Sequence, residues 1–168
     1  MMKKIIDVVS SIIFCGFIFI AILLLIPRFM GIQPIAVLSG SMEPSYHVGS
    51  VVYVKQNISR DNIQVGDVIT FNISDETMVT HRVVSINDDH YVTKGDANEV
   101  NDGGYIRYNQ IVGKCVFSIP YLGYIAMYAA SQKGILTLFF ILFLTILITF
   151  IPEYLLLKKG GKDSEKTY

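Results

Sequence analysis

The sequence predicts a mainly β fold, in which an antiparallel β domain is held between an N-terminal and a C-terminal transmembrane helix. The chain has 168 residues and is 52% hydrophobic, with two long uncharged stretches near its ends. Between these stretches, short runs rich in Val, Ile, Thr, Tyr and Phe alternate with turn residues, a pattern typical of antiparallel sheets.

The two apolar stretches cover residues 8–26 (VVSSIIFCGFIFIAILLLI) and 134–151 (GILTLFFILFLTILITFI). Each approaches the roughly 20 residues that cross a bilayer core as a helix. The sequence after the first, LIPRFMGIQP, lacks the small-x-small exit site of a cleavable signal peptide. We therefore expect an uncleaved anchor followed by a second span.

Lysines flank both predicted spans. Lys3 and Lys4 precede the first span, and four more follow the second, at 158, 159, 162 and 166. Because basic flanks stay in the cytoplasm, we expect residues 1–7 and 152–168 to be cytoplasmic and residues 27–133 extracytoplasmic. The sequence thus predicts a multi-pass protein of the cell membrane, with the lipid bilayer as a partner.

The charge balance and the cysteine content argue against a nucleic-acid-binding protein and against a disulfide-stabilised one. Fourteen basic residues balance fourteen acidic ones, so nothing indicates a nucleic-acid partner. Cys15 lies in the first predicted span and Cys115 in the outer domain, which leaves no disulfide framework.

Six strands are expected in the outer domain, because turn sequences such as QVGD, NDD and NDGG separate the β-rich runs. The predicted strands are Ile35–Ser39, Ser50–Lys55, Asp67–Ile73, Met78–Ile86, His90–Gly95 and Ile111–Ile119. Residues 119–133, with their tyrosines and small side chains, are expected to lie at the membrane surface.

Ser41 lies between a glycine and a methionine in VLSGSMEPSYHVGS, residues 37–50. Serine and proline are common in turns, so a purely structural role is one interpretation. The other is a nucleophile, which requires a base to take the hydroxyl proton.

The chain has three histidines that could act as this base, all in the extracytoplasmic segment. His47 precedes a Val-Gly turn and is expected to be exposed, and His90 lies in a polar hairpin tip. His81 stands in MVTHRVVSI, a strand built for burial, where an imidazole is held rigidly.

Two acids, Asp96 and Asp102, follow in the turn-rich segment TKGDANEVNDGG. Either could orient the imidazole of His81, and either could instead cap its own loop. A zinc site is the rival constellation, but the sequence contains no HExxH or CxxC motif, so we expect no metal and no cofactor.

A series of motifs, SGSMEP, GDVITF, THRVV, KGDANEVND and IPYLG, resembles type I signal peptidase across nearly the whole outer domain. Most bacterial members place a lysine where this chain has His81. The chain therefore resembles the endoplasmic-reticulum subtype, shared by eukaryotes, archaea and some Gram-positive bacteria. Its second span resembles the arrangement in Gram-positive members.

The resemblance implies a signal-peptidase-like antiparallel β catalytic domain in which Ser41 is the nucleophile and His81 the general base. It suggests that Asp102 pairs with His81 and that Asp96 is a supporting acid. It also implies an oxyanion hole formed by the backbone N–H of Ser41, with the Ser39 hydroxyl as a candidate second donor.

A membrane-bound serine endopeptidase that removes signal peptides from exported preproteins is thus expected, cleaving after a small-x-small segment. The substrate would add as a strand beside Ile35, Val37 and Ser39, so that alternate side chains enter pockets. Signal-peptide-bearing preproteins are the expected partners, with the secretion translocon as a further one.

Two other functions stay open from the residues alone. One is a non-enzymatic membrane-anchored β module that binds exported chains or a translocon partner, with Ser41 in a simple turn. The other is a self-processing or repressor-type serine peptidase, a class that is soluble and generally uses lysine. The two predicted spans and His81 disfavour it.

Overall fold

The computed structural model describes residues 2–147 and contains two compact units. One unit is Leu23–Met127, and the other combines residues 2–22 with residues 128–147. The first unit contains the sheet and every residue singled out as a candidate for chemistry.

The N-terminal helix α1 runs from Met2 to Phe29, and its segment Val8–Phe29 is long and apolar enough to cross a membrane. The predicted span at 8–26 therefore lies on one continuous helix, which also includes residues 2–7. The helix ends just before Gly31, whose φ of 71° is left-handed, as is common immediately after a helix.

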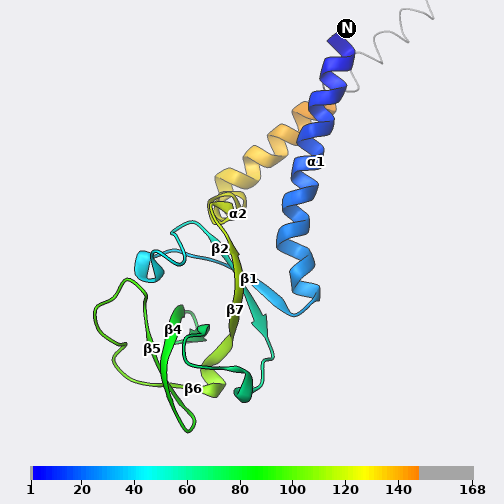
Figure 1. The fold of residues 1–168 in the computed structure, drawn as a ribbon. Helices are drawn as coiled ribbons and strands as arrows, with labels where there is room; N and C mark the ends of the chain where they lie inside the picture. Colours follow the sequence, from blue (N-terminus) through cyan, green and yellow to red (C-terminus); the bar gives the residue numbers. More distant parts are fainter. Residues whose placement is uncertain (1, 148–168) are drawn as a thin grey trace, which may run out of the picture. The chain divides into compact units, whose positions relative to one another are not determined.

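Seven antiparallel strands form one sheet in the order β1-β2-β7-β3-β4-β5-β6. Figure 1 labels β1, β2, β4, β5, β6 and β7 of this sheet. The strands are β1 (Ile32–Ala36), β2 (Val51–Gln56), β3 (Val68–Asn72), β4 (Met78–Asn87), β5 (His90–Lys94), β6 (Ile106–Arg107) and β7 (Ile111–Ile119). All six predicted strands have a counterpart, and β6 is an addition that the sequence did not predict.

The first strand differs from its prediction, because β1 begins and ends three residues earlier than Ile35–Ser39. The chain nevertheless continues extended beyond Ala36. The N–H of Val37 donates to the carbonyl of Ser50 at 2.9 Å, and Ser39 has φ −130° and ψ 161°. Strand geometry thus persists up to the serine-bearing turn.

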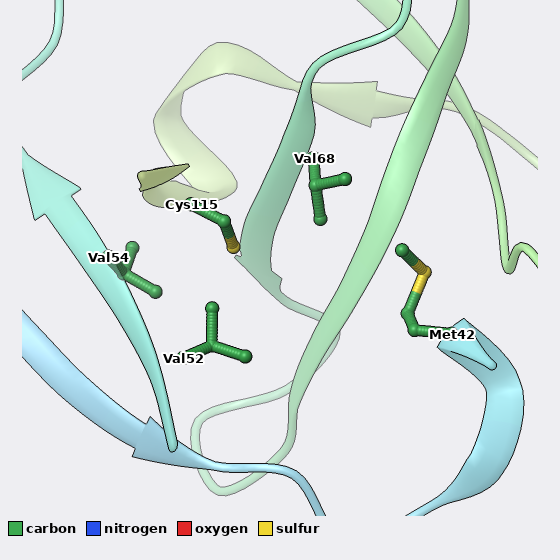
Figure 2. Packing of buried hydrophobic residues seen from close by; sticks show 5 residues of the cluster. All are labelled: Met42, Val52, Val54, Val68 and Cys115. Carbon is green, nitrogen blue, oxygen red and sulfur yellow. The ribbon is translucent and has the colours of Figure 1, made fainter. Parts of the chain in front are cut away.

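Alternate side chains of the strands fill two separate clusters. Figure 2 shows one, in which side chains from β2, β3 and β7 point toward the same space as the side chain of Met42. Its buried members are Met42, Val52, Val54, Val68 and Cys115. The second cluster is built from Ile63, Ile69, Phe71, Val83 and Tyr91.

A short helix, α2 (Leu122–Ala130), lies where the sequence predicts the membrane-surface segment 119–133. A second helix, Gln132–Leu147, follows it after a bend of 89°. Over the described residues, neither helix alone is long and apolar enough to cross a membrane, although the bent pair passes together. A straight second span at 134–151 is therefore not shown, and residues 148–151 lie outside the described part.

Candidate active site

Ser41 lies in a single 3₁₀ turn, Gly40–Met42, just after the extended chain that continues β1. The next residue, Met42, is only 2% exposed and inserts into the first hydrophobic cluster. The carbonyl of Ser41 accepts the N–H of Ala97 at 2.9 Å. The turn is therefore held from both sides, by a buried side chain and by a backbone hydrogen bond.

His81 lies on β4, opposite Ile69 of β3, and is 8% exposed. Its ring meets that of Phe71 edge-on, with the centroids 6.5 Å apart. The Nε2 atom lies 3.1 Å from the Oγ of Ser41, within hydrogen-bonding distance. The strand thus places the imidazole directly beside the hydroxyl, although 40 residues separate the two in sequence.

The carboxylate of Asp102 lies on the other side of the imidazole, with Oδ2 at 2.6 Å from Nδ1. The same oxygen accepts the hydroxyl of Thr93 at 2.7 Å, and the N–H of Asp102 donates to the Thr93 carbonyl at 2.8 Å. An Nδ1–H that donates to Asp102 leaves Nε2 with a lone pair toward Ser41. A proton can then pass from hydroxyl to imidazole.

Asp96 takes a different partner. Its two oxygens accept Nε and Nη2 of Arg82 at 2.8 and 2.5 Å, a bidentate pair, and this hydrogen bonding lowers the pKa of the carboxyl below its ordinary value. Arg82 also donates to the carbonyl of Gly66 at 2.8 Å. Of the two acids left open by the sequence, Asp102 therefore contacts the imidazole and Asp96 ties neighbouring loops to β4.

A groove of about 540 Å³ runs past Ser41 and His81. The chain from Ile35 to Ser39 lines one part of it, and residues 76–81 line another. The Oγ of Ser39 is 3.4 Å from that of Ser41. The groove therefore exposes the Ser41 hydroxyl beside two stretches of extended chain.

The other two histidines lie away from this arrangement. His47 is exposed and pairs with Glu43, while His90 packs edge-on against Tyr105 with the centroids 4.2 Å apart. Within residues 2–147, no group of three His, Cys, Asp or Glu side chains is arranged to hold a metal ion.

Sequence reasoning missed three contributors to the site. Thr93 and Arg82 bind the two acids, and Gly95 allows a close backbone approach: a Cβ there would lie 2.6 Å from the carbonyl oxygen of Ser41. Arg82 directly follows His81, which was a usable signal. Gly95 lies in the motif KGDANEVND, whereas Thr93 had no sequence signal, because its role depends on a tertiary contact.

The sequence of this chain is similar to a known family and to several known proteins. Residues 9–105 match the family model described as signal peptidase, peptidase S26. The chain is 39% identical over 112 residues to signal peptidase I W of Bacillus subtilis (strain 168), covering 60% of this chain and 59% of that protein. It is 32% identical over 106 residues to the human signal peptidase complex catalytic subunit SEC11C, covering 55% of each.

A third relative, the putative human signal peptidase complex catalytic subunit SEC11B, is 33% identical over 104 residues, covering 54% of this chain and 62% of that protein. The chain thus spans a little over half the length of the relatives that it matches.

Proposed function

This chain belongs to the signal peptidase family, peptidase S26, and we propose that it is a membrane-bound serine endopeptidase that removes signal peptides from exported preproteins. The observation that carries the proposal is the continuous set of contacts from the Ser41 hydroxyl through the imidazole of His81 to the carboxylate of Asp102. Such a set activates a hydroxyl that is otherwise a poor nucleophile at neutral pH.

In the first half of the proposed reaction, the Oγ of Ser41 attacks the scissile carbonyl carbon while Nε2 of His81 takes the hydroxyl proton. The tetrahedral intermediate collapses when the C–N bond breaks, and His81 returns the proton to the leaving amine. In the second half, His81 takes a proton from water and the hydroxide attacks the acyl ester carbon. The ester C–O bond then breaks, the cleaved segment leaves with a new carboxyl end, and His81 returns the proton to the Oγ of Ser41.

Asp102 would hold the imidazole in the required tautomer and stabilise the imidazolium that forms in each half. The hydroxyl of Thr93 would fix the carboxylate for this task, since it donates to the same oxygen that accepts from His81. Asp96 would act indirectly, because it holds Arg82 and therefore the strand that carries His81.

The negative charge on the carbonyl oxygen needs donors that are in place before the reaction. The backbone N–H of Ser41 is one proposed donor, because the turn that bears it is held by Met42 and by Ala97. The Ser39 hydroxyl, 3.4 Å from the Ser41 hydroxyl, is the proposed second donor.

An extended substrate fits the groove because two strand edges along it lack strand partners. Among the described strands, β1 pairs only with β2, and the part of β4 from Met78 to His81 pairs with β3 but not with β5. A preprotein segment would hydrogen bond as an added strand beside Ile35, Val37 and Ser39, with small side chains at alternate positions entering pockets near Ser41.

The membrane topology completes the proposal. The apolar helix Val8–Phe29 would anchor the catalytic domain, residues 27–133, on the extracytoplasmic side of the cell membrane. Both termini would be cytoplasmic, and the chain from 134 to 151 would cross the bilayer again. The substrate's own apolar segment would lie in the same bilayer, and the translocon would deliver it.

The direct test is cleavage of a preprotein in liposomes by the purified full-length wild type and by Ser41→Ala, with sequencing of the new N-terminus. Cleavage by the wild type alone, after a small-x-small segment, is the expected result. Equal cleavage by both proteins would show that Ser41 is not the nucleophile. Retention of the preprotein without cleavage by either protein would favour the alternative, a non-enzymatic module that binds exported chains.

A further inference from the structure

One charged side chain lines the groove at the end remote from Ser41. Among the described residues that line the groove, Glu76 is the only one with a carboxylate or an ammonium or guanidinium group, and the others are apolar, hydroxyl-bearing or His81 itself. No salt bridge among the described residues involves Glu76. Its charge is therefore available to whatever occupies the groove.

The direction of the groove follows from the sheet. Successive neighbours from β1 through β2, β7 and β3 to β4 are antiparallel, so β1 and β4 run the same way. The chain from Ile35 leads to Ser41, and the chain from Glu76 leads to His81. Ile35 and Glu76 therefore mark one end of the groove, and the reacting groups mark the other.

The position of Glu76 sets which substrate residue it can reach. It precedes His81 by five positions and belongs to the turn Ser74–Thr77 between β3 and β4. Five positions of extended chain span about 16 Å, so Glu76 lies opposite the substrate residue about four to six positions from the scissile bond.

We propose that Glu76 selects substrates that carry a basic side chain about five residues upstream of the cleavage site. The inference rests on the proposed function, in which the upstream segment lies beside Ile35–Ser39. A lysine or arginine there would meet an unpaired carboxylate, and a glutamate would be repelled. Because Glu76 is exposed, the preference is an effect of a few fold that salt weakens.

Asp75 supplies a matched control. It is exposed, adjacent in the same turn and identical in charge, but it does not line the groove. The experiment measures kcat/KM of the full-length protein for one preprotein that carries Lys, Gln or Glu in turn at positions four, five and six upstream. The proteins compared are the wild type, Glu76→Gln, Glu76→Lys and Asp75→Asn.

At low ionic strength the wild type should prefer Lys over Glu by about fivefold at one of these positions. Glu76→Gln should bring that ratio close to one, Glu76→Lys should invert it, and Asp75→Asn should keep it. Added salt should shrink the wild-type ratio, which a purely structural role of Glu76 would not cause.

An unchanged ratio in Glu76→Gln, or an equal change in Asp75→Asn, would overturn the inference. The Gln-bearing preprotein tests the proposed peptidase function separately from the charge preference of Glu76. If the wild type cleaves it and Ser41→Ala does not, the proposed function stands whatever the charge ratio. If the wild type does not cleave it, the proposed function fails and this inference fails with it.

Discussion

The buried hydroxyl of Thr93 contacts Asp102, and in the proposed reaction it would act without touching the substrate. Thr93 is buried, and its Oγ1 donates to the carboxylate oxygen that also accepts from His81. A carboxylate held by two donors keeps its orientation as the imidazole gains and loses its proton.

Replacing Thr93 with valine should therefore lower kcat by about tenfold, the equivalent of one hydrogen bond to a charged group, and leave KM nearly unchanged. Thr70→Val is the control, because Thr70 is equally buried but bonds to Thr80 and Cys115. Steady-state kinetics on both variants, with melting curves, would distinguish the two roles. A similar fall in kcat for Thr70→Val would count against a specific role for Thr93.

The ion pair between Asp96 and Arg82 should make the stability of the fold depend on pH. The pKa of Asp96 is lowered in the folded state, first of all by the hydrogen bonds from Arg82. Such a group stabilises the fold above its unfolded pKa and loses that contribution as the pH falls through the lower folded value. The wild type should thus lose stability below about pH 5 more steeply than Asp96→Asn.

Thermal unfolding of both proteins in detergent between pH 7 and pH 3 would check this expectation. Parallel curves for the two proteins would show that the Arg82 pair does not contribute to acid stability.

Among the elements, the 3₁₀ turn at Gly40–Met42 depends on its buried methionine. The Met42 side chain enters the cluster formed by Val52, Val54, Val68 and Cys115 (Figure 2). Burial in this cluster raises the pKa of the Cys115 thiol to about 12. The turn is anchored by the side chain of Met42, which is buried in this cluster.

Met42→Ala should cost about 2–5 kcal/mol of stability and should also lower kcat, because the same side chain positions Ser41. Val54→Ala opens a cavity in the same cluster from β2, and it should reduce stability without a comparable loss of kcat. Both rates would be measured well below each variant's melting temperature. If Val54→Ala lowered kcat as much as Met42→Ala, the anchoring role of Met42 would be contradicted.

The strands were predictable from composition and alternation, because each long run has a buried face that the pattern records. The strand ends were harder to predict. The regular antiparallel pairing of β1 with β2 ends at Ala36 opposite Val51, although Ser39 still has extended backbone angles. β6 has two residues, too few to carry a pattern. The helix α2 has mostly apolar and small residues, which read as a membrane-surface segment without indicating a helix.

Some residues of the candidate site were also predictable from the sequence, and others were not. The chemistry of serine and histidine singled out Ser41 and His81, because a hydroxyl needs a base and only one histidine lies within a strand built for burial. Asp96 and Asp102 were equivalent by residue type and by loop context, and only the family resemblance suggested Asp102 as the partner of His81. Their distinction depends on which one packs beside β4 and which one meets Arg82, a matter of tertiary contact.

The proposed position of the catalytic domain near the bilayer depends on exposed aromatic side chains. Tyr121 is 71% exposed and precedes α2 directly. Its ring is thus free to enter the headgroup region, where tyrosine is favoured.

Tyr121→Asp should leave cleavage of a soluble peptide in detergent unchanged but slow cleavage of a preprotein in vesicles by several fold. Because the ring is exposed, its removal should cost the protein little packing. Comparing the two rates in parallel would check this, and an equal loss with both substrates would contradict a membrane role for Tyr121.

We propose that Ser41 and His81 act as one catalytic unit, which single-turnover cleavage of a preprotein by Ser41→Ala, His81→Ala and the double variant would test. Groups that act as a unit are strongly non-additive. Each single change should nearly abolish cleavage, and the double change should cost little more. If each single change lowered the cleavage rate only slightly and the two effects multiplied in the double variant, Ser41 and His81 would not act as a unit.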